Sequence, residues 1–521
     1  MKKIAIIGAG PSGICTAKEL SRIKDVSIKI FEKTNALGGV FSSINAYEGL
    51  ELVNNPFLVA FSDFPIRDDF DNLMMPKAEE YSLYLEKYAK KFNVFDLISF
   101  NTKVLNVEKS EDGVKWNLTF QKDGERFTEK FCYVVVCSGV HSTPQTIEIT
   151  GQEKFSGKIL HSSEFKDFKL FKGKNVTLVG SGEYSSDIAF FISKEAKSTC
   201  VSVRRWPGYI IPRYHDGKPT DLDTSRLHHS LLKDDSADSS IFLKSKRFLE
   251  YFQIKSNDSK EIQRLANKLN KQCNAGPFRR TTNKSEKLVR AILENSVQLK
   301  PKISSIIENN ITFEDGTNFD CDYIVMCTGF RVDFPFLESS IQKKSNNIRE
   351  MFKYMIPEGV DNIAFIGFIR PGIGAIPPMS EMQARYLALI LDGSKKIPPY
   401  SKFRKSINTQ LEKDMKQYPF DAHRVTGLTD YFSFLEDMAS EIGCHLRYSR
   451  LLLSPRLLYK VMTSTFCVAQ YRLYGKYNNK DASSEIIKKL PGSHLLNLII
   501  LFIAFIGMKS KILIKKIIVR K

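Results

Sequence analysis

Ile4-Ala5-Ile6-Ile7-Gly8-Ala9-Gly10-Pro11-Ser12-Gly13 is the stretch that decides the fold of this chain. Its first four residues are apolar without interruption, as in a parallel strand that is buried on both faces. Gly8 permits a tight turn, Gly10 lets the backbone approach a pyrophosphate, and Gly13 lets the following helix pack closely. The stretch therefore predicts a strand, a turn and a helix whose N-terminus holds a dinucleotide.

The next predicted strand, residues 26–31, ends in an acidic side chain. Glu32 follows the glycine turn by about 20 residues, the spacing at which a carboxylate bonds a ribose hydroxyl. A carboxylate there would repel a 2′-phosphate, so this first site suits FAD better than NADP. Gly39 is a second place where the backbone can approach a phosphate. The predicted FAD-binding residues are Gly8, Gly10, Gly13, Glu32 and Gly39.

Residues 176–185, VTLVGSGEYS, repeat the pattern with a serine in place of the third glycine. Ser185 is small enough for a moderately close helix contact and can cap the helix. The next strand, residues 200–203, ends in two cations where the first unit has an acid. Cations there suit a ribose 2′-phosphate and favour NADPH over NADH. The predicted NADPH-binding residues are Gly180, Gly182, Ser185, Ser202, Arg204 and Arg205, with Arg213 as a further candidate for phosphate contact.

Composition excludes several classes of protein. The nine cysteines include no Cys-x-x-Cys, which argues against a zinc site, an iron–sulfur cluster and a dithiol redox centre, and so against a disulfide reductase. The net charge is +19, yet the basic residues form no basic–aromatic stripe of the kind that binds nucleic acid. Phosphate-bearing cofactors and an anionic membrane surface account for the charge better. We therefore expect no metal and no nucleic-acid partner.

Between the two turns, residues 155–165 read FSGKILHSSEF. This stretch is similar to the Phe-x-Gly-x-x-x-His-Ser-x-x-aromatic signature of the flavin-containing monooxygenases, and the chain resembles that family along nearly its whole length. The resemblance extends to the strand ends at 134–139 and 323–330 and to residues 372–385. Residues 470–475 resemble a late segment of the membrane-associated, animal-type dimethylaniline/N-oxide-forming enzymes.

The resemblance implies an α/β fold with two dinucleotide-binding, Rossmann-like domains and a helical C-terminal region. Residues 1–165 and 325–400 would form a discontinuous FAD-binding domain. The NADPH-binding domain, residues 166–324, would be inserted in it and would carry a polar, helix-like insertion at about 214–285. Residues 401–493 would form the helical region.

The last residues, 494–521, are apolar at first and then basic. The apolar run from Leu495 to Met508 is shorter than the roughly 20 residues that span a bilayer, and six lysines and arginines follow it. This pattern predicts an anchor at a membrane surface, or a tail anchor if both parts form one helix. We expect an intracellular, membrane-associated protein, at the endoplasmic reticulum if eukaryotic and at the cytoplasmic membrane if bacterial. Homo-oligomerisation stays open.

The family's activity is implied for this chain. NADPH would reduce FAD, the reduced flavin would take up O2, and a flavin hydroperoxide would transfer one oxygen atom to a soft nucleophilic nitrogen or sulfur of a small amine or sulfide. By resemblance, Asn54 is the catalytic residue, near the flavin and nicotinamide. The spacing from Asn54 to Asp63 is about one residue shorter than in the family, so Asn55 stays open as the alternative.

Two other activities stay open. In Baeyer–Villiger enzymes, which oxygenate ketones, the related signature ends in His-x-x-x-Trp followed by Pro or Asp, whereas this chain has Phe165-Lys166. This difference favours heteroatom oxygenation. An NADPH oxidase that releases H2O2 is the second alternative, because Glu183-Tyr184 stands where relatives often carry Asn-Ser.

Overall fold

The computed structural model describes residues 1–492 except 206–207, 233–255, 274–275, 277–278 and 346. The predicted membrane anchor, residues 494–521, lies outside the described residues. Within the described part of the chain, no helix is long and apolar enough to cross a membrane.

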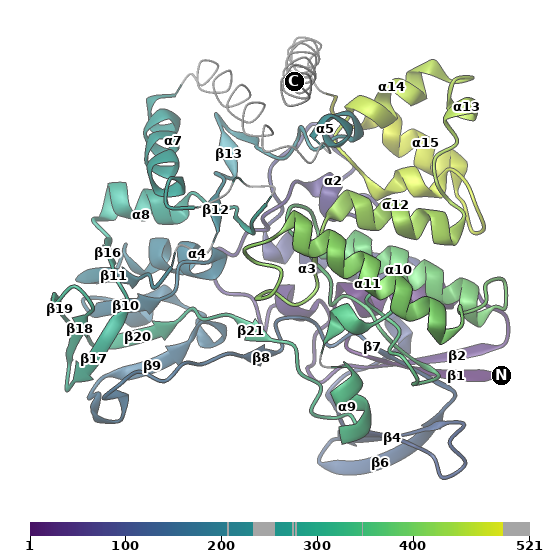
Figure 1. The fold of residues 1–521 in the computed structure, drawn as a ribbon, viewed down its shortest axis with the longest axis horizontal. Coiled ribbons are helices and arrows are strands. Elements are labelled where there is room, and N and C mark those ends of the chain that lie inside the picture. The colour runs from purple at the N-terminus through teal and green to yellow at the C-terminus, as the bar shows by residue number, and fades with distance from the viewer. Residues whose placement is uncertain (206–207, 233–255, 274–275, 277–278, 346, 493–521) are drawn as a thin grey trace, which may run out of the picture.

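The first glycine turn follows the central strand of a parallel sheet (Figure 1). β1 pairs with β2 on one side and with β7 on the other, so that Ile7 faces Phe31 and Val136. The sheet order is β22-β7-β1-β2-β3. The strands are β1 (Lys2–Ile7), β2 (Val26–Phe31), β3 (Ile98–Ser99), β7 (Tyr133–Val136) and β22 (Ile363–Phe365).

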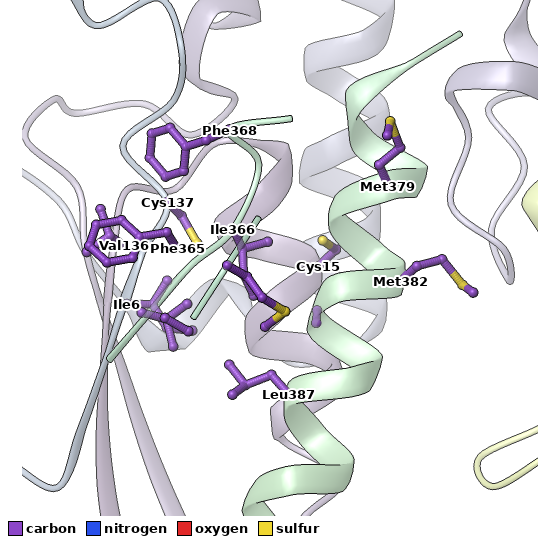
Figure 2. Packing of buried hydrophobic residues seen from close by; sticks show 14 of the residues in the cluster. Ile6, Cys15, Val136, Cys137, Phe365, Ile366, Phe368, Met379, Met382 and Leu387 are labelled. Atoms are coloured by element: carbon purple, nitrogen blue, oxygen red, sulfur yellow. The ribbon is translucent and has the colours of Figure 1, made fainter. Parts of the chain in front are cut away.

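Two helices that are far apart in the sequence pack together on this sheet. α1 (Pro11–Leu20) begins directly after the glycine turn, and α10 (Ile376–Leu391) lies beside it. Figure 2 shows the side chains of Ile6, Cys15 and Leu387, from β1, α1 and α10, gathered in one apolar core. The unit also holds α2 (Pro56–Val59), α3 (Ala78–Lys91), α9 (Ser339–Ser345) and the antiparallel strands β4 (Thr102–Lys109), β5 (Trp116–Lys122) and β6 (Glu125–Phe131).

The second glycine turn follows the central strand of a second parallel sheet, in the order β16-β11-β10-β20-β9. Its strands are β9 (Lys158–His161), β10 (Asn175–Val179), β11 (Ser198–Ser202), β16 (Gln298–Lys300) and β20 (Tyr323–Met326). α4 (Glu183–Ile192) and α8 (Lys287–Asn295) pack together beside it, and β17 (Ile303–Ile307), β18 (Asn310–Phe313) and β19 (Asn318–Asp320) form a small antiparallel sheet. The α/β fold with two dinucleotide-binding units is therefore confirmed.

One predicted boundary needs a correction. Residues 158–161, which we expected in the first domain, form β9 and pair with β20 in the second sheet. The pairing brings Lys158 opposite Tyr323 and His161 opposite Met326. The apolar residues of β20 are buried on both faces, and β9 covers its otherwise open edge.

In its described residues, the segment at about 214–285 is only partly helical. It contains α5 (Arg226–Leu232) and α7 (Asn257–Asn270), but also the hairpin of β13 (Tyr214–His215) and β14 (Lys218–Pro219). β15 (Thr282–Asn283) pairs with β12 (Tyr209–Ile210) and returns the chain toward the second glycine turn.

The C-terminal region packs on the first unit through buried charges. Arg472 is fully buried, and its guanidinium contacts Ser62 at 2.7 Å, Glu381 at 2.8 Å and also Glu19. The region contains α11 (Tyr400–Gln417), α12 (Tyr431–Ile442), α13 (Tyr448–Leu451), α14 (Pro455–Thr463), the 3-10 helix η7 (Val468–Arg472) and α15 (Lys480–Lys489), and β24 (Leu428–Thr429) pairs with β23 (Arg370–Pro371).

Candidate functional site

One cavity of about 1820 Å³ reaches both glycine turns. Ligand pockets usually measure roughly 300–1,000 Å³, so this cavity has room for more than one ligand. It lies at the carboxyl ends of β1 and β10, where parallel α/β sheets bind ligands. Of the predicted site residues, the cavity wall includes Gly8, Gly10, Glu32, Gly39, Asn54, Gly180, Gly182, Ser202, Arg204 and Arg205, and not Gly13, Asn55 or Ser185.

The first turn has no space for a side chain at Gly8 or at Gly13. Gly8 has φ +107°, and a Cβ there would lie 2.6 Å from the carbonyl oxygen of Cys137. A Cβ at Gly13 would lie 1.9 Å from the carbonyl oxygen of Gly8, so the close helix packing predicted for Gly13 requires glycine. A Cβ at Gly39 would lie 3.2 Å from the Cα of Gly10, so the two glycine-bearing loops leave only bare backbone at this wall.

The carboxylate of Glu32 is fixed at the end of β2. One oxygen accepts from the Ala9 N–H at 2.9 Å, and the other accepts from the N–H and the hydroxyl of Thr34 at 3.0 and 2.8 Å. A carboxylate has about four acceptor positions, so one more donor can still bond to it. Glu32 thus lines the cavity as an oriented acceptor, the chemistry that a ribose hydroxyl requires.

The second turn repeats the first with one change. Gly180 has φ +108°, and a Cβ there would lie 2.6 Å from the carbonyl oxygen of Cys327, which takes the place of Cys137 in the first turn. A Cβ at Gly182 would meet nothing within 4 Å, so its backbone borders open space. Ser185 does not cap the helix as we expected: Gly182 is the N-cap residue, and the Ser185 hydroxyl donates to the Gly180 carbonyl at 2.6 Å.

Two exposed cations follow β11 on the cavity wall. Arg204 and Arg205 form no ion pair with any described residue, so both guanidinium groups are available to a phosphate. Ser202 also lines the cavity, but its hydroxyl donates to the Pro301 carbonyl at 2.9 Å. The arrangement fits the predicted 2′-phosphate contact through the two arginines, and this role stays a prediction.

Arg213 does not fit the phosphate role that its sequence suggested. Its guanidinium is 1 % exposed and forms an ion pair with Asp187 at 2.9 Å and with Glu51 at 3.3 Å. Its Nε also donates to the Lys284 carbonyl at 3.1 Å. Because the carboxylates already neutralise this charge, Arg213 joins the segment around Glu51 to α4 instead of holding a phosphate.

Glu183 and Tyr184 form the start of α4 at the cavity. Glu183 accepts from the backbone N–H of Lys284 at 3.1 Å, and burial raises the pKa of its carboxyl. The ring of Tyr184 packs against His141 and Phe330, and burial together with Glu183 raises the pKa of its hydroxyl to about 12. An acid at a helix N-terminus opposes anion binding there, and its raised pKa lessens that cost.

Asn54 and Asn55 have different surroundings. Asn55 is fully buried, and its side-chain oxygen accepts from the N–H groups of Phe57 and Leu58 as the N-cap of α2. Asn54 lines the cavity, with its Nδ2 3.3 Å from the Oδ2 of Asp221. The geometry therefore favours Asn54 over Asn55 as the residue that can meet a ligand, and its catalytic role stays a prediction.

Asp221 gathers several donors beside Asn54. Its Oδ2 accepts from the backbone N–H of Asn55 at 3.0 Å and lies 2.5 Å from the Nζ of Lys284. Asp221 and Lys284 are 5 % and 7 % exposed, and burial lowers the pKa of the Lys284 ammonium although Asp221 opposes this. Neither residue has a motif around it in the sequence, so only the fold reveals them.

Arg370 is a further cavity residue that sequence reasoning missed. Its guanidinium forms no hydrogen bond or ion pair with any described residue, and burial lowers its pKa while Glu183 opposes the shift. His141 lies in the same wall, and burial together with Arg370 lowers its pKa to about 3, so His141 is neutral at physiological pH. The stretch that resembles the family, residues 372–385, begins two residues after Arg370, so the sequence did not single out this arginine.

His161 holds the segments that cross between the two units. Its Nε2 lies 3.0 Å from the Gly329 carbonyl, its Nδ1 lies 2.8 Å from the Ser163 hydroxyl, and its ring packs edge-on against Phe330. Phe330 belongs to β21 (Phe330–Arg331), which pairs with β8 (Thr143–Pro144). His161 therefore fixes the crossing, and it does not line the cavity.

The described residues offer no metal site, since no group of three or more His, Cys, Asp or Glu side chains among them could hold an ion. The cysteines nearest the glycine turns are buried thiols, and burial raises the pKa of both Cys137 and Cys327 to about 12. The walls instead fit two dinucleotides: backbone without side chains at each turn, a ribose acceptor at the first and phosphate-binding cations at the second.

Comparison with known proteins agrees with this geometry. The family model described as FMO-like, flavin-binding monooxygenase-like, matches residues 1–493. The chain is 33% identical over 498 residues to a 4-hydroxybenzoate brominase (decarboxylating) of Marinomonas mediterranea, covering 94% of this chain and 93% of that protein. It is 30% identical over 493 residues to human flavin-containing monooxygenase 3, covering 91% and 89%.

The fold is shared with a solved structure. The S-allyl-L-cysteine S-oxygenase of Allium sativum superposes with a TM-score of 0.60 at 22% identity, over 87% of this chain and 91% of that one.

Proposed function

Since the chain belongs to the flavin-binding monooxygenase-like family and is an oxidoreductase that uses FAD and NADPH, we propose that it inserts one atom of O2 into a soft nucleophilic nitrogen or sulfur of a small amine or sulfide. Bound FAD, once reduced by NADPH, supplies the activation of O2. The protein must bind both cofactors in one place, orient them and keep water away.

The observation that carries the proposal is that one cavity is lined by both glycine turns and by Asn54. Glu32 and the backbone of Gly8, Gly10 and Gly39 would hold FAD, and Arg204 with Arg205 would hold the 2′-phosphate of NADPH. The cavity cysteines Cys137 and Cys327 are buried thiols with raised pKa values and are poor nucleophiles, which suits a reaction in which the substrate itself is the nucleophile.

The test is product analysis of the purified holoenzyme with NADPH, O2 and three probes: a tertiary amine, a thioether and a cyclic ketone. N-oxide or sulfoxide formation supports the proposal. Lactone without N-oxide or sulfoxide would indicate Baeyer–Villiger oxygenation instead. H2O2 in a one-to-one ratio with consumed NADPH for every probe would indicate an oxidase.

Rapid mixing gives an independent measurement. The reduced, NADP⁺-bound protein is mixed with O2, and the return of oxidised-flavin absorbance is followed. A delay that shortens when an amine or thioether is present supports oxygen transfer. Immediate return without a delay supports the oxidase.

A second candidate is oxidation of bromide, which is also a soft nucleophile. It is favoured by the 33% identity to a 4-hydroxybenzoate brominase and by Arg370. The Arg370 guanidinium has no hydrogen-bond or ion-pair partner among the described residues, which suits a carboxylate-bearing aromatic substrate. The assay uses 4-hydroxybenzoate with and without bromide. Bromide-dependent brominated phenol, reduced in Arg370→Gln but not in the cavity-rim control Arg331→Gln, would favour this reaction over oxygenation.

We also propose that the protein associates with a membrane through residues 494–521. Their apolar and then basic sequence supports this, and an endoplasmic-reticulum or bacterial cytoplasmic membrane is the expected location. Fractionation of cells that produce the full chain tests it, and recovery of all activity in the high-speed supernatant would contradict it.

A further inference from the structure

The turn between α13 and α14 exposes two neighbouring leucines. Leu453 is 85 % exposed and Leu452 is 65 % exposed, and the rings of Tyr448 and Tyr459 on either side are each about half exposed. Single exposed apolar residues are common on protein surfaces, but a contiguous group marks an interaction site. These four residues are called the leucine turn below.

The leucine turn is a firmly supported structure. Leu451 precedes it and is buried, and Leu457 and Val461 on the inner side of α14 are buried as well. All three belong to one apolar cluster with Ile487 and Leu490. The inner faces of α13 and α14 are therefore packed in an apolar cluster, and the leucine turn lies on their solvent-exposed side.

The surroundings of the leucine turn are cationic. Residues 445–460 contain four lysines and arginines and no aspartate or glutamate. Arg450 and Arg456 flank the two leucines and are exposed. Neither forms an ion pair with any described residue, although Arg456 is near enough to Glu485 on α15 to help lower the pKa of that carboxyl. In an anionic bilayer surface, apolar residues can enter the acyl region, tyrosines lie at the interface and cations meet the lipid phosphates. The leucine turn and its flanking arginines have the residue types for these three layers.

The chain leaves the described structure beside the same helix. The N–H of Thr465 donates to the Pro491 carbonyl at 3.0 Å, and the Lys460 ammonium donates to the Leu490 carbonyl at 2.6 Å. Residues 490–492 thus lie at the C-terminal end of α14, and Leu452 and Leu453 precede its N-terminal end. The helix is nine residues long, which corresponds to about 14 Å. Both lie in the part of the molecule where Figure 1 places α13 and α14, away from the two parallel sheets.

We propose that the leucine turn docks on an anionic lipid surface, with Leu452 and Leu453 in the acyl region and Arg450 and Arg456 at the lipid phosphates. Docking at this point would orient the protein and would add to the attachment proposed for residues 494–521. The inference rests on that membrane association and not on the reaction.

The experiment places a reporter at the tip. The chain has two tryptophans, of which Trp116 is fully buried. Leu453→Trp in the full-length holoenzyme adds one at the apex, and Ile307→Trp is the matched control, because Ile307 is 66 % exposed on β17 at the opposite side of Figure 1. Both are mixed with phosphatidylcholine vesicles, with and without phosphatidylglycerol, whose acyl chains carry bromine as a quencher.

The docking predicts that brominated vesicles with phosphatidylglycerol remove most of the emission added by Leu453→Trp and none of that added by Ile307→Trp. The double variant Arg450→Gln/Arg456→Gln should weaken vesicle binding on the order of tenfold. Vesicle binding without quenching at position 453 would show that another part of the chain attaches alone, and would overturn the proposal. Absence of quenching together with a dimer that Leu452→Asp/Leu453→Asp dissociates would also overturn it, since a second copy would then cover the turn.

Catalysis without vesicles separates this test from the proposed reaction. Leu453→Trp should retain the wild-type rate of NADPH oxidation in solution. Quenching with no oxygenated product would support the docking and contradict the proposed reaction.

Discussion

The hydroxyl of Ser185 donates to the backbone carbonyl of Gly180 at 2.6 Å, in the place where the first glycine turn has only the bare Cα of Gly13. In the first turn the equivalent carbonyl, that of Gly8, would collide with a Cβ at position 13. In the second turn the Gly180 carbonyl instead accepts a hydrogen bond from the serine. The two turns share a strand–turn–helix path but differ in how closely the helix approaches the strand.

Ser185→Ala should weaken the second unit and leave the first intact. The substitution leaves the partly buried Gly180 carbonyl without its hydroxyl donor, which costs about 1 kcal/mol. For a unit of this size we expect the melting temperature to fall by about 2–4 °C. Calorimetry and the flavin content of the purified protein measure the two effects.

Gly13→Ala is the contrasting variant and should lose FAD, because its Cβ would lie 1.9 Å from the Gly8 carbonyl. Retention of FAD in Gly13→Ala would contradict this account of the first turn.

Arg204→Ala should weaken NADPH and leave NADH almost unchanged. A charge-assisted bond to the 2′-phosphate would be lost, which we expect to raise the KM for NADPH about 10- to 100-fold. Steady-state rates with each nucleotide measure this effect. Lys103→Ala, also on the cavity wall but beside the first unit, is the control. An equal effect of Arg204→Ala on both nucleotides would remove the phosphate role.

Glu183→Gln should bind NADPH about two- to fivefold more tightly, because it removes a negative charge from the N-terminus of α4. Burial raises the pKa of Glu183, and Asp187 adds to this shift, whereas the Lys284 N–H, Arg213 and Arg370 oppose it. In the wild type the carboxyl is therefore protonated up to a pH above its ordinary range. NADPH affinity should decrease as the pH rises through that raised pKa.

The variant should lack this pH dependence, which titration of NADPH at several pH values measures. The sign for stability is the same: a raised pKa favours folding at low pH and disfavours it above the ordinary pKa of glutamate. A wild type with pH-independent affinity over that range would contradict the assignment.

Asp221→Asn should release the amide of Asn54. A carboxylate can only accept, so Asp221 holds the NH2 group of Asn54 and leaves the amide oxygen of Asn54 for the cavity. We expect more H2O2 per NADPH and weaker NADP⁺ binding, measured by the change in flavin absorbance. In an Asn54→Ala background, Asp221→Asn should add less than it does in the wild type, and the remainder should reflect its contacts with Asn55 and Lys284. Full additivity of the two substitutions would mean that Asp221 acts independently of Asn54.

Arg472→Met should destabilise the protein by about 3–5 kcal/mol, because it leaves buried carboxylates without their partner. Burial opposes ionisation of Glu19, but Arg472 and Lys18 outweigh it and hold its pKa well below the ordinary range. The network therefore stabilises the wild type at neutral pH and loses its effect as the pH falls through that lowered pKa. Denaturation of the holoenzyme at neutral and acid pH measures both effects. An exposed control, Arg404→Met, should change little, and equal loss in both variants would contradict the role of burial.

Much of the site could be predicted from the sequence because short-range geometry determines it. Gly8, Gly13 and Gly180 lie where a side chain would collide with a backbone carbonyl, and such positions are visible as glycines in a strand–turn–helix pattern. Glu32 and Arg204 follow the next strand in each unit, so parallel pairing alone brings them to the turns. The phosphate contact suggested for Arg213 was wrong, because the sequence around Arg213 does not show that Glu51 and Asp187, from distant segments, pair with it.

The sequence by itself therefore predicted two dinucleotide sites, one beside an acid and one beside two arginines. Short stretches of contiguous residues are enough for this prediction, because they contain both the glycine turn and the residue at the end of the next strand. The tertiary structure decided what surrounds them. Asn54 lines the cavity, whereas Asn55 caps α2. Asp221 and Lys284 lie next to Asn54 although they are more than 160 positions away in the chain. Long-range contacts of this kind depend on how the whole chain packs, and no local pattern encodes them.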